Sequence, residues 1–237
     1  MDRIEVKKVI ENYANIDNIW SDNDKWHFYT YKKINAFINR HVRALNLLDK
    51  NRVINLGSGG NSYCFDDETV LHVDILDKNI KNKKHFLVSN IEHMNVPSDF
   101  YDIGICVGSV INYTDAMTSI KEIARIIKTD GLLFLEFENS RSFEFLGSNT
   151  YNKKASVVTT FYQNRKEMLW VYSEAYIMAL LKMYGFRIIN KHRFHIFTPL
   201  LYRIAKDSDI AMKVYWMDKI FHFLPLSSNV LVLAKKE

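Results

Sequence analysis

The feature that most constrains the fold is a series of short, nearly uninterrupted apolar runs in the middle of the chain. They are "RVINL" (52–56), "TVLHVDI" (69–75), "HFLVS" (85–89), "DIGICVG" (102–108) and "GLLFLEFE" (131–138). A half-exposed strand alternates polar and apolar residues, whereas continuous hydrophobicity is typical of parallel strands buried on both faces. We therefore predict a parallel sheet that is covered by helices on both sides.

The connection between the fourth and fifth runs predicts a strand–helix–strand unit. In "YTDAMTSIKEIARIIKT" (113–129), apolar residues recur at helical spacing, Asp115 can cap the start, and Gly131 follows the end. A crossover of this kind between parallel strands is right-handed. The intervals 58–68 and 76–84 are too short for full crossover helices, so we expect a single turn at most in each.

The C-terminal half predicts one further helix, a hairpin and the last strands. The segment "SEAYIMALLKMYGF" (173–186) is amphipathic, with Ser173 as a cap and Gly185 as a stop. Residues 157–172 alternate like a β-hairpin with its turn near 163–165. The stretches 187–197 and 228–236 complete the set of expected strands.

Two further segments have the spacing of amphipathic helices. Within 209–226, one apolar stripe predicts a single helix, which could serve as a core or dimer-contact helix, a cap, or a membrane-surface helix. The stripe consists of Ile210, Val214, Met217, Phe221 and Leu224. Near the N-terminus, Ile34, Phe37, Ile38, His41 and Leu45 form a second stripe.

Aromatic residues gather just ahead of the N-terminal stripe, at Trp20, Trp26, Phe28, Tyr29 and Tyr31. Two interpretations remain open: a helix docked on the core with its aromatic residues buried, or part of a lid over a pocket. Ser21 and Asp22 are possible N-caps of this helix.

Composition limits the classes of function. The net charge of +5 and a pI near 9.0 are mildly basic, and the densest lysine run, "DKNIKNKKH" (77–85), is most simply a solvated connection. Two cysteines without metal-ligand spacing predict neither a disulfide framework nor a metal site. No window holds 18 consecutive apolar residues, so we expect no transmembrane segment and a reduced, cytoplasmic location.

A glycine-rich turn follows the first apolar run in "RVINLGSGGN" (52–61). Taken alone, such a turn is either a tight corner or a loop that approaches a ligand closely. The second run ends at Asp74, and an acidic residue at the tip of the second strand can accept hydrogen bonds from both hydroxyls of a ribose. The pair therefore favours a nucleotide-type cofactor.

Five motifs in order resemble the class I S-adenosylmethionine-dependent methyltransferases: "VINLGSGGN", "HVDI", "VSNIEHM", "FYDIGICVGSVINYTD" and "IARIIKTDGLLFLEF". The resemblance covers residues 50–140 closely and 170–237 loosely. It implies an α/β fold with a Rossmann-like, doubly wound, seven-stranded and mostly parallel sheet, whose last strand is antiparallel, together with a helical N-terminal cap.

The same resemblance implies the domain organisation and the cofactor. Residues 1–48 would form a helical cap or lid, and residues 49–237 the methyltransferase domain, with a substrate-side insertion at 139–172 and a helical insertion at 198–227. S-adenosyl-L-methionine would be the methyl donor and S-adenosyl-L-homocysteine the product.

Carried over position by position, the resemblance also implies cofactor-binding residues on four loops and on the N-terminal helix. The methionine portion would contact Asn55, Gly57, Ser58 and Gly59; the ribose Asp74; the adenine Ile75, Asn90 and Ile91; the sulfonium region Val107 and Gly108; and Tyr31 would cover the site. Asn55 replaces an acidic residue that is common in the family, and Asn61 replaces the third glycine of its loop.

Catalysis by this family depends mainly on positioning, because the sulfonium is already an activated donor. A base is required only when the acceptor must lose a proton. Asn112 stands where the family often has a histidine, which puts a base-dependent mechanism in doubt. The catalytic candidates are Tyr31, Asn112, Tyr113 and Glu138, and further possible bases are His27, His192 and His195.

The sequence therefore favours methyl transfer to an O or N atom of a small-molecule, glycan or natural-product acceptor, with nucleic acid not expected as a partner and a monomer or homodimer as the assembly. Two alternatives stay open. One is an RNA or protein methyltransferase, suggested by the basic pI. The other is a cofactor-binding module without turnover, suggested by Asn55 and the shortened loops.

Overall fold

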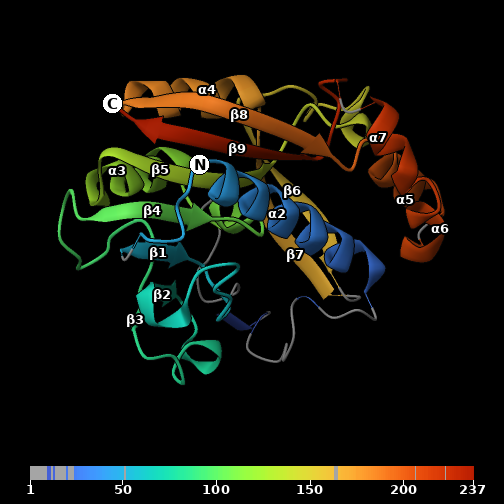
Figure 1. The fold of residues 1–237 in the computed structure, drawn as a ribbon. Coiled ribbons are helices and arrows are strands. Elements are labelled where there is room, and N and C mark those ends of the chain that lie inside the picture. Colours follow the sequence, from blue (N-terminus) through green and yellow to red (C-terminus); the bar gives the residue numbers. More distant parts are fainter. Residues whose placement is uncertain are drawn as a thin grey trace.

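The computed structural model describes residues 10, 11, 13, 20, 24–50, 52–162, 165–205, 207–221 and 223–237 (Figure 1). The α-helices are α2 (Lys25–Ala44), α3 (Ala116–Ile126), α4 (Glu174–Met183), α5 (Thr198–Ala205), α6 (Ser208–Met212) and α7 (Asp218–Phe221). The strands are β1 (Val53–Leu56), β2 (Val70–Asp74), β3 (Phe86–Val88), β4 (Tyr101–Cys106), β5 (Ile127–Glu138), β6 (Ala155–Tyr162), β7 (Arg165–Tyr172), β8 (Phe186–Phe194) and β9 (Asn229–Lys236). Single 3-10 turns are η1 (Asp67–Thr69), η2 (Asp77–Asn79), η3 (Val110–Tyr113), η4 (Phe143–Phe145) and η5 (Tyr215–Met217).

Seven of these strands form one sheet in the order β3-β2-β1-β4-β5-β9-β8. Neighbours from β3 to β5 pair in parallel, whereas β9 is antiparallel to both β5 and β8. The predicted fold class is therefore confirmed. The strand order reverses between β1 and β4, and in open sheets of this kind ligands bind outside the carboxyl ends of the strands at that point.

Helices cover both faces of the sheet (Figure 1). On one face α2 inserts Ile34, Phe37, Ile38 and Val42 into a core that it shares with β1, β4, β5 and β9. On the other face α3 and α4 pack over the same strands. Because four α2 side chains are buried in the domain core, this part of the N-terminal segment docks firmly on the sheet.

The connections on either side of β2 contain only the single turns η1 and η2, as their lengths predicted. Phe65 and its neighbours occupy the space over β1 that a crossover helix would fill. The buried His72 supports this loop, because its Nδ1 lies 3.1 Å from Ser58 Oγ and its Nε2 lies 3.1 Å from Asp67 Oδ1.

Helix caps agree with the sequence at two helices and differ at a third. The side chain of Asp115 accepts a hydrogen bond from the Thr118 N–H at 2.8 Å, and the side chain of Ser173 caps α4 in the same way. Prediction of Ser21 or Asp22 as the N-cap of α2 was wrong; both lie outside the described residues. The cap is Asp24, whose extended backbone lets its carboxylate accept from the His27 N–H at 3.2 Å.

The predicted single helix over 209–226 is also wrong, because the structure divides this segment into α6, η5 and α7. Asp218, the first residue of α7, is buried and accepts hydrogen bonds from the backbone N–H groups of His195 and Ile196, which fixes this helix against the chain that follows β8. The hairpin expected at 157–172 is confirmed as the antiparallel pair β6–β7.

Within the described ranges, no helix is both long and apolar enough to cross a membrane.

Candidate active site

The glycine loop after β1 forms a compact turn that is tied to the neighbouring strand. Gly57, Gly59 and Gly60 have φ values of 66°, 51° and 82°, a region that favours glycine. The Ser58 N–H donates to the Val73 carbonyl at 3.0 Å. The Asn55 amide donates to the Asn61 carbonyl at 2.6 Å, so this predicted cofactor contact also holds the loop closed.

Asp74, at the end of β2, meets the glycine loop directly. Its Oδ2 accepts from the Gly59 N–H at 2.9 Å, and its Oδ1 accepts from the Leu76 N–H at 3.0 Å. Burial raises the pKa of this carboxyl, and these backbone hydrogen bonds oppose the rise. Each carboxylate oxygen retains further acceptor capacity, so the group can still bind hydroxyls. Ile75 follows as a half-buried side chain.

The loop after β3 carries Asn90 and Ile91. The Asn90 side chain forms two contacts with Glu92: its Oδ1 accepts from the Glu92 N–H and its Nδ2 donates to the Glu92 carboxylate, both at 3.0 Å. The other Glu92 oxygen accepts from the Asp115 N–H at 2.7 Å. Ile91 is buried in the core, which leaves its backbone as the part available to a ligand.

The turn after β4 is held by a buried carboxylate that the sequence pattern did not single out. Gly108 and Ser109 have φ values of 80° and 60°. Glu136, fully buried on β5, accepts from the Ser109 N–H at 2.5 Å and from the Asn229 amide at 2.6 Å. An acidic residue inside the apolar run "LLFLEFE" was the signal that could have revealed it.

Aromatic side chains gather beside this turn. A Cβ placed on Gly108 would come within 3.2 Å of the Trp20 indole, so the indole lies directly against the strand end. The ring centroids of Trp20 and Tyr31 lie 5.6 Å apart, and those of Tyr31 and Tyr63 lie 6.4 Å apart. Tyr31, from α2, thus lies between Trp20 and Tyr63, which follows the glycine loop. Burial raises the pKa of the Tyr63 hydroxyl, which is therefore neutral.

Two predicted catalytic residues, Asn112 and Glu138, lie together but have different environments. Asn112 is fully buried; its Nδ2 donates to the Glu138 and Trp170 carbonyls, and its Oδ1 accepts from the Glu138 N–H. Its amide is thus committed to the backbone. The Glu138 carboxyl is half-buried at the end of β5, where burial and then the nearby charges of Glu136 and Glu144 raise its pKa to about 8.

Tyr113 lies deeper in the substrate-side region. Its hydroxyl donates to the Glu167 carboxylate at 2.7 Å and lies 2.9 Å from the Tyr13 hydroxyl. Burial, together with these two neighbours, holds the pKa of Tyr113 well above its usual value. This network joins the N-terminal segment to the β6–β7 hairpin.

The structure places the three candidate histidines in other settings. His27 Nδ1 lies 2.7 Å from the carboxylate of the α2 cap, Asp24. His195 is fully buried and stacks on Trp26 at 4.2 Å, and burial holds its pKa well below the usual value. His192 lies on edge strand β8, which two strands separate from β4.

The chemistry of the collected groups fits S-adenosylmethionine. Backbone N–H groups in a glycine turn, a carboxylate at the tip of β2 and an amide after β3 lie along one edge of the sheet, at the carboxyl ends of β1 to β4. The arrangement offers hydrogen-bond partners to an amino acid, a ribose and an adenine in turn. In the described part of the chain, no group of three or more His, Cys, Asp or Glu side chains is arranged to hold a metal ion.

Comparison with known proteins gives the same class. Residues 54–135 match the family described as "Methyltransferase domain". A 1,6-didemethyltoxoflavin-N1-methyltransferase from Burkholderia thailandensis, solved with S-adenosylhomocysteine, is 11% identical with a TM-score of 0.59, over 98% of this chain and 87% of that one. An S-adenosylmethionine-dependent methyltransferase from Clostridium acetobutylicum is 14% identical with a TM-score of 0.57, over 97% and 98%. The cyclase SpnF also shares the fold, with 11% identity and a TM-score of 0.55, over 85% and 80%.

A search of curated protein sequences found no match. The matched domain and the sheet topology nevertheless agree with each other and with the motifs. Residues 54–135 therefore match a methyltransferase domain, and the sheet that contains them has the Rossmann-like fold that these solved structures share.

The glycine loop provides a first prediction. Gly57→Ala adds a Cβ at a φ of 66° and only 2.3 Å from the Val110 side chain, so we expect the free energy of unfolding to fall by about 2–5 kcal/mol from backbone strain and overpacking together. Gly147→Ala is the matched control, because its φ is 79° but nothing lies within 4 Å of the added atom. Urea denaturation of both variants measures how much unfolding free energy each substitution removes. If both removed the same amount, crowding at Gly57 would make no contribution.

Proposed function

We propose that the protein is an enzyme that transfers a methyl group from S-adenosylmethionine to an O or N atom of a small-molecule acceptor. The observation that carries this proposal is the position of Glu138. Its titratable carboxyl lies at the end of β5, beside the turn that follows β4, where Ser109 and the buried Glu136 are its neighbours.

In this proposal the chain's own residues hold the cofactor as follows. Backbone groups of Gly57, Ser58 and Gly59 contact the methionine portion, and the Asp74 carboxylate accepts from the ribose hydroxyls. Asn90 and the Ile91 backbone meet the adenine, against which Ile75 packs. Val107 and Gly108 border the reacting region, and Tyr31 covers it together with Trp20. When bound, S-adenosylmethionine supplies an activated methyl group.

The protein's remaining task is to position the acceptor and to take up its proton. Asn112 fixes the Glu138 backbone through two hydrogen bonds, so we assign it a positioning role. Glu138 is the proposed general base, since a carboxyl with a pKa of about 8 is much more basic than an ordinary one. The Tyr113 phenol, with its raised pKa, stays protonated and acts as a hydrogen-bonding wall.

The choice of a small acceptor rests on enclosure and on charge. The described Trp20 and Tyr31 lie at the end of β4 and would enclose an acceptor there. The lysines expected for a nucleic-acid acceptor are in part neutralised, because Lys83 and Lys84 form ion pairs with Asp67 and Glu68. The Burkholderia thailandensis structure contains a small acceptor, 1,6-didemethyltoxoflavin.

A screen tests the proposal. The purified full chain is incubated with S-adenosylmethionine carrying a labelled methyl group and with sets of small phenols, amines, carboxylates and sugars, alongside RNA and protein mixtures. We expect S-adenosylhomocysteine to form together with a labelled small product. Cofactor binding without any labelled product across all the sets would contradict the proposal and favour a non-catalytic module.

A further inference from the structure

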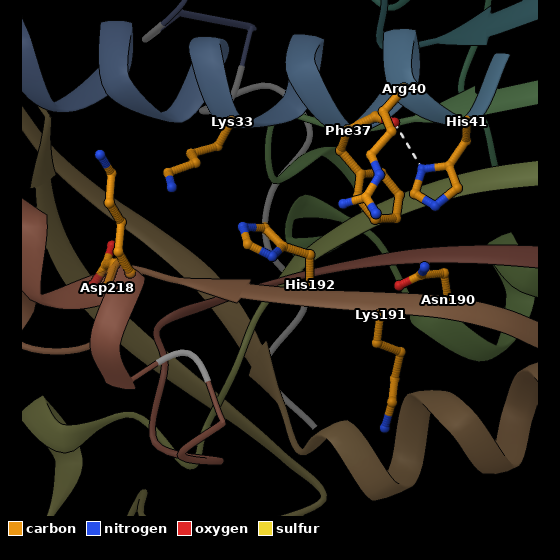
Figure 2. A pocket seen from close by; sticks show the side chains of 9 residues that line it. Lys33, Phe37, Arg40, His41, Asn190, Lys191, His192 and Asp218 are labelled. Atoms are coloured by element: carbon orange, nitrogen blue, oxygen red, sulfur yellow. Dashed lines mark hydrogen bonds between the residues drawn. The ribbon is translucent and has the colours of Figure 1, made fainter. Parts of the chain in front are cut away.

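A pocket lies between α2 and the edge strand β8, away from the carboxyl ends of β1, β2 and β4 (Figure 2). Its volume is about 380 Å³. Lys33, Phe37 and Arg40 line it from α2, and Asn190 and His192 line it from β8. No residue assigned above to the cofactor or to the acceptor belongs to its lining.

An irregularity in β8 creates the polar wall of this pocket. Ile188 pairs with Ala234, but Asn190 pairs with Leu233, so one extra residue is inserted between them. Ala234 belongs to the core under α3 and α4, whereas Leu233 belongs to the core under α2. The bulge therefore turns Asn190, and every second residue after it, toward α2. Without it, Asn190 would share the face of Ile188.

Cations from two helices line the pocket, Lys33 and Arg40 on α2 and Lys219 on α7, and the nearby Asp218 carboxylate attracts Lys33 without forming an ion pair with it. Among the residues that the structure describes, neither Lys33 nor Arg40 has a carboxylate within ion-pair distance. Lys191, by contrast, points away from α2 in Figure 2, and its Nζ reaches the Glu174 carboxylate on α4 at 2.5 Å. The Nζ of Lys33 lies 5.1 Å above the Tyr29 ring instead. Within the described residues, two positive side chains of α2 therefore line the pocket without an ion pair.

Asp218 contributes a carboxylate to the same lining, but this group is already used. Its Oδ2 accepts from the His195 N–H at 2.8 Å and from the Tyr29 hydroxyl at 3.0 Å, and its Oδ1 accepts from the Ile196 N–H at 3.0 Å. The α2 side of the pocket therefore offers donors to a ligand, an ammonium and a guanidinium, and the Asn190 amide adds a further donor from β8.

Burial lowers the pKa of Lys33, which is the cost of placing an ammonium in a partly enclosed site without an ion pair. A bound anion would remove that cost. Arg40 is exposed at the rim of the pocket, where its planar group can form two parallel hydrogen bonds to one oxyanion.

We propose that this pocket binds a small molecule that carries a phosphate monoester, with the phosphate between Lys33 and Arg40. Three terminal oxygens and a double negative charge match a site that is rich in donors and has two unpaired cations. The volume lies within the range of ordinary small-molecule sites and is too confined for a tract of nucleic acid.

The test uses the full chain, with inorganic phosphate and glucose 6-phosphate as probes, each compared with sodium chloride at equal ionic strength. Titration calorimetry and thermal unfolding should show saturable binding and a raised Tm for the wild type. The double variant Lys33→Gln/Arg40→Gln should bind glucose 6-phosphate at least about tenfold more weakly, from the loss of charge-assisted hydrogen bonds. Lys32→Gln is the control, because Lys32 is exposed on the same helix and lies over the Phe28 ring, outside the pocket.

Four results would overturn the proposal. The first is the absence of saturable binding, and the second is equal affinity in the wild type and the double variant. The third is tighter binding of a single-stranded oligonucleotide that depends on the same two residues, which would indicate a nucleic-acid surface. The fourth is loss of phosphate binding when S-adenosylhomocysteine saturates the protein, which would place the phosphate in the cofactor site. Asp74→Ala changes the proposed cofactor site but not this pocket, so it should still bind phosphate. The test of the pocket is therefore independent of the proposed enzymatic function.

Discussion

Asp74→Ala should weaken the binding of S-adenosylhomocysteine about 10- to 150-fold, the effect of losing roughly 1.5–3 kcal/mol of hydrogen bonding to a charged group. The structure gives two reasons. The carboxylate lies at the tip of β2 with acceptor capacity to spare, and it also fixes the Gly59 N–H of the glycine loop. Titration calorimetry with the purified full chain measures the change directly.

The control for this experiment is Asp77→Ala. Asp77 is exposed in η2, three positions further along the chain, so its removal changes the net charge equally without touching the loop. We expect its affinity for S-adenosylhomocysteine to match that of the wild type. An unchanged affinity in Asp74→Ala would contradict the role of this carboxylate. An equal loss of affinity in both variants would mean that only the net charge of the protein matters.

The central sheet and two helix caps could be predicted because the information is local. Continuous apolar runs specify buried parallel strands, and Asp115 and Ser173 precede helices whose first N–H groups need acceptors. The short connections around β2 likewise followed from chain length alone. Each of these features depends on neighbours within a few positions of the sequence.

The features that the sequence did not predict depend on partners far along the chain. Asp218 binds the backbone N–H groups of His195 and Ile196, and no pattern within 209–226 announces that contact. Glu136 holds the turn after β4 together with Asn229, which lies 93 positions later. The bulge at Ile188 and Asn190 arises from pairing with β9. Tertiary contacts of this kind override local periodicity.

The site divides in the same way. The glycine loop and Asp74 could be placed from motifs, because they lie at the carboxyl ends of two neighbouring strands, β1 and β2. Asn55 and Asn112 were expected near ligands, and the structure shows that their amides also serve the backbone, at Asn61 and at Glu138. An amide in a motif position is ambiguous from sequence, because the same group can bind a ligand or close a loop.

Glu138→Gln should lower acceptor turnover by about 10²–10⁴-fold, the usual contribution of a general base, while leaving the affinity for S-adenosylhomocysteine unchanged. In the wild type, kcat/KM should rise with pH and level off above about pH 8, since the active form is the carboxylate and burial raises its pKa to about 8. Glu144→Gln removes a neighbouring charge that contributes to this rise, so it should move the inflection to lower pH with little loss at the plateau.

Thermal unfolding separates this role from a structural one. Because the folded state keeps the Glu138 proton to a higher pH than the unfolded chain does, this residue contributes less stability as the pH rises from about 4.5 toward 8. Glu138→Gln removes that penalty, so its Tm relative to the wild type should be higher at pH 9 than at pH 5. A variant that is inactive yet more stable at alkaline pH is the signature of a buried base. If Glu138→Gln kept full turnover with an unchanged pH profile, proton transfer would have to be assigned to another group or be unnecessary for the acceptor.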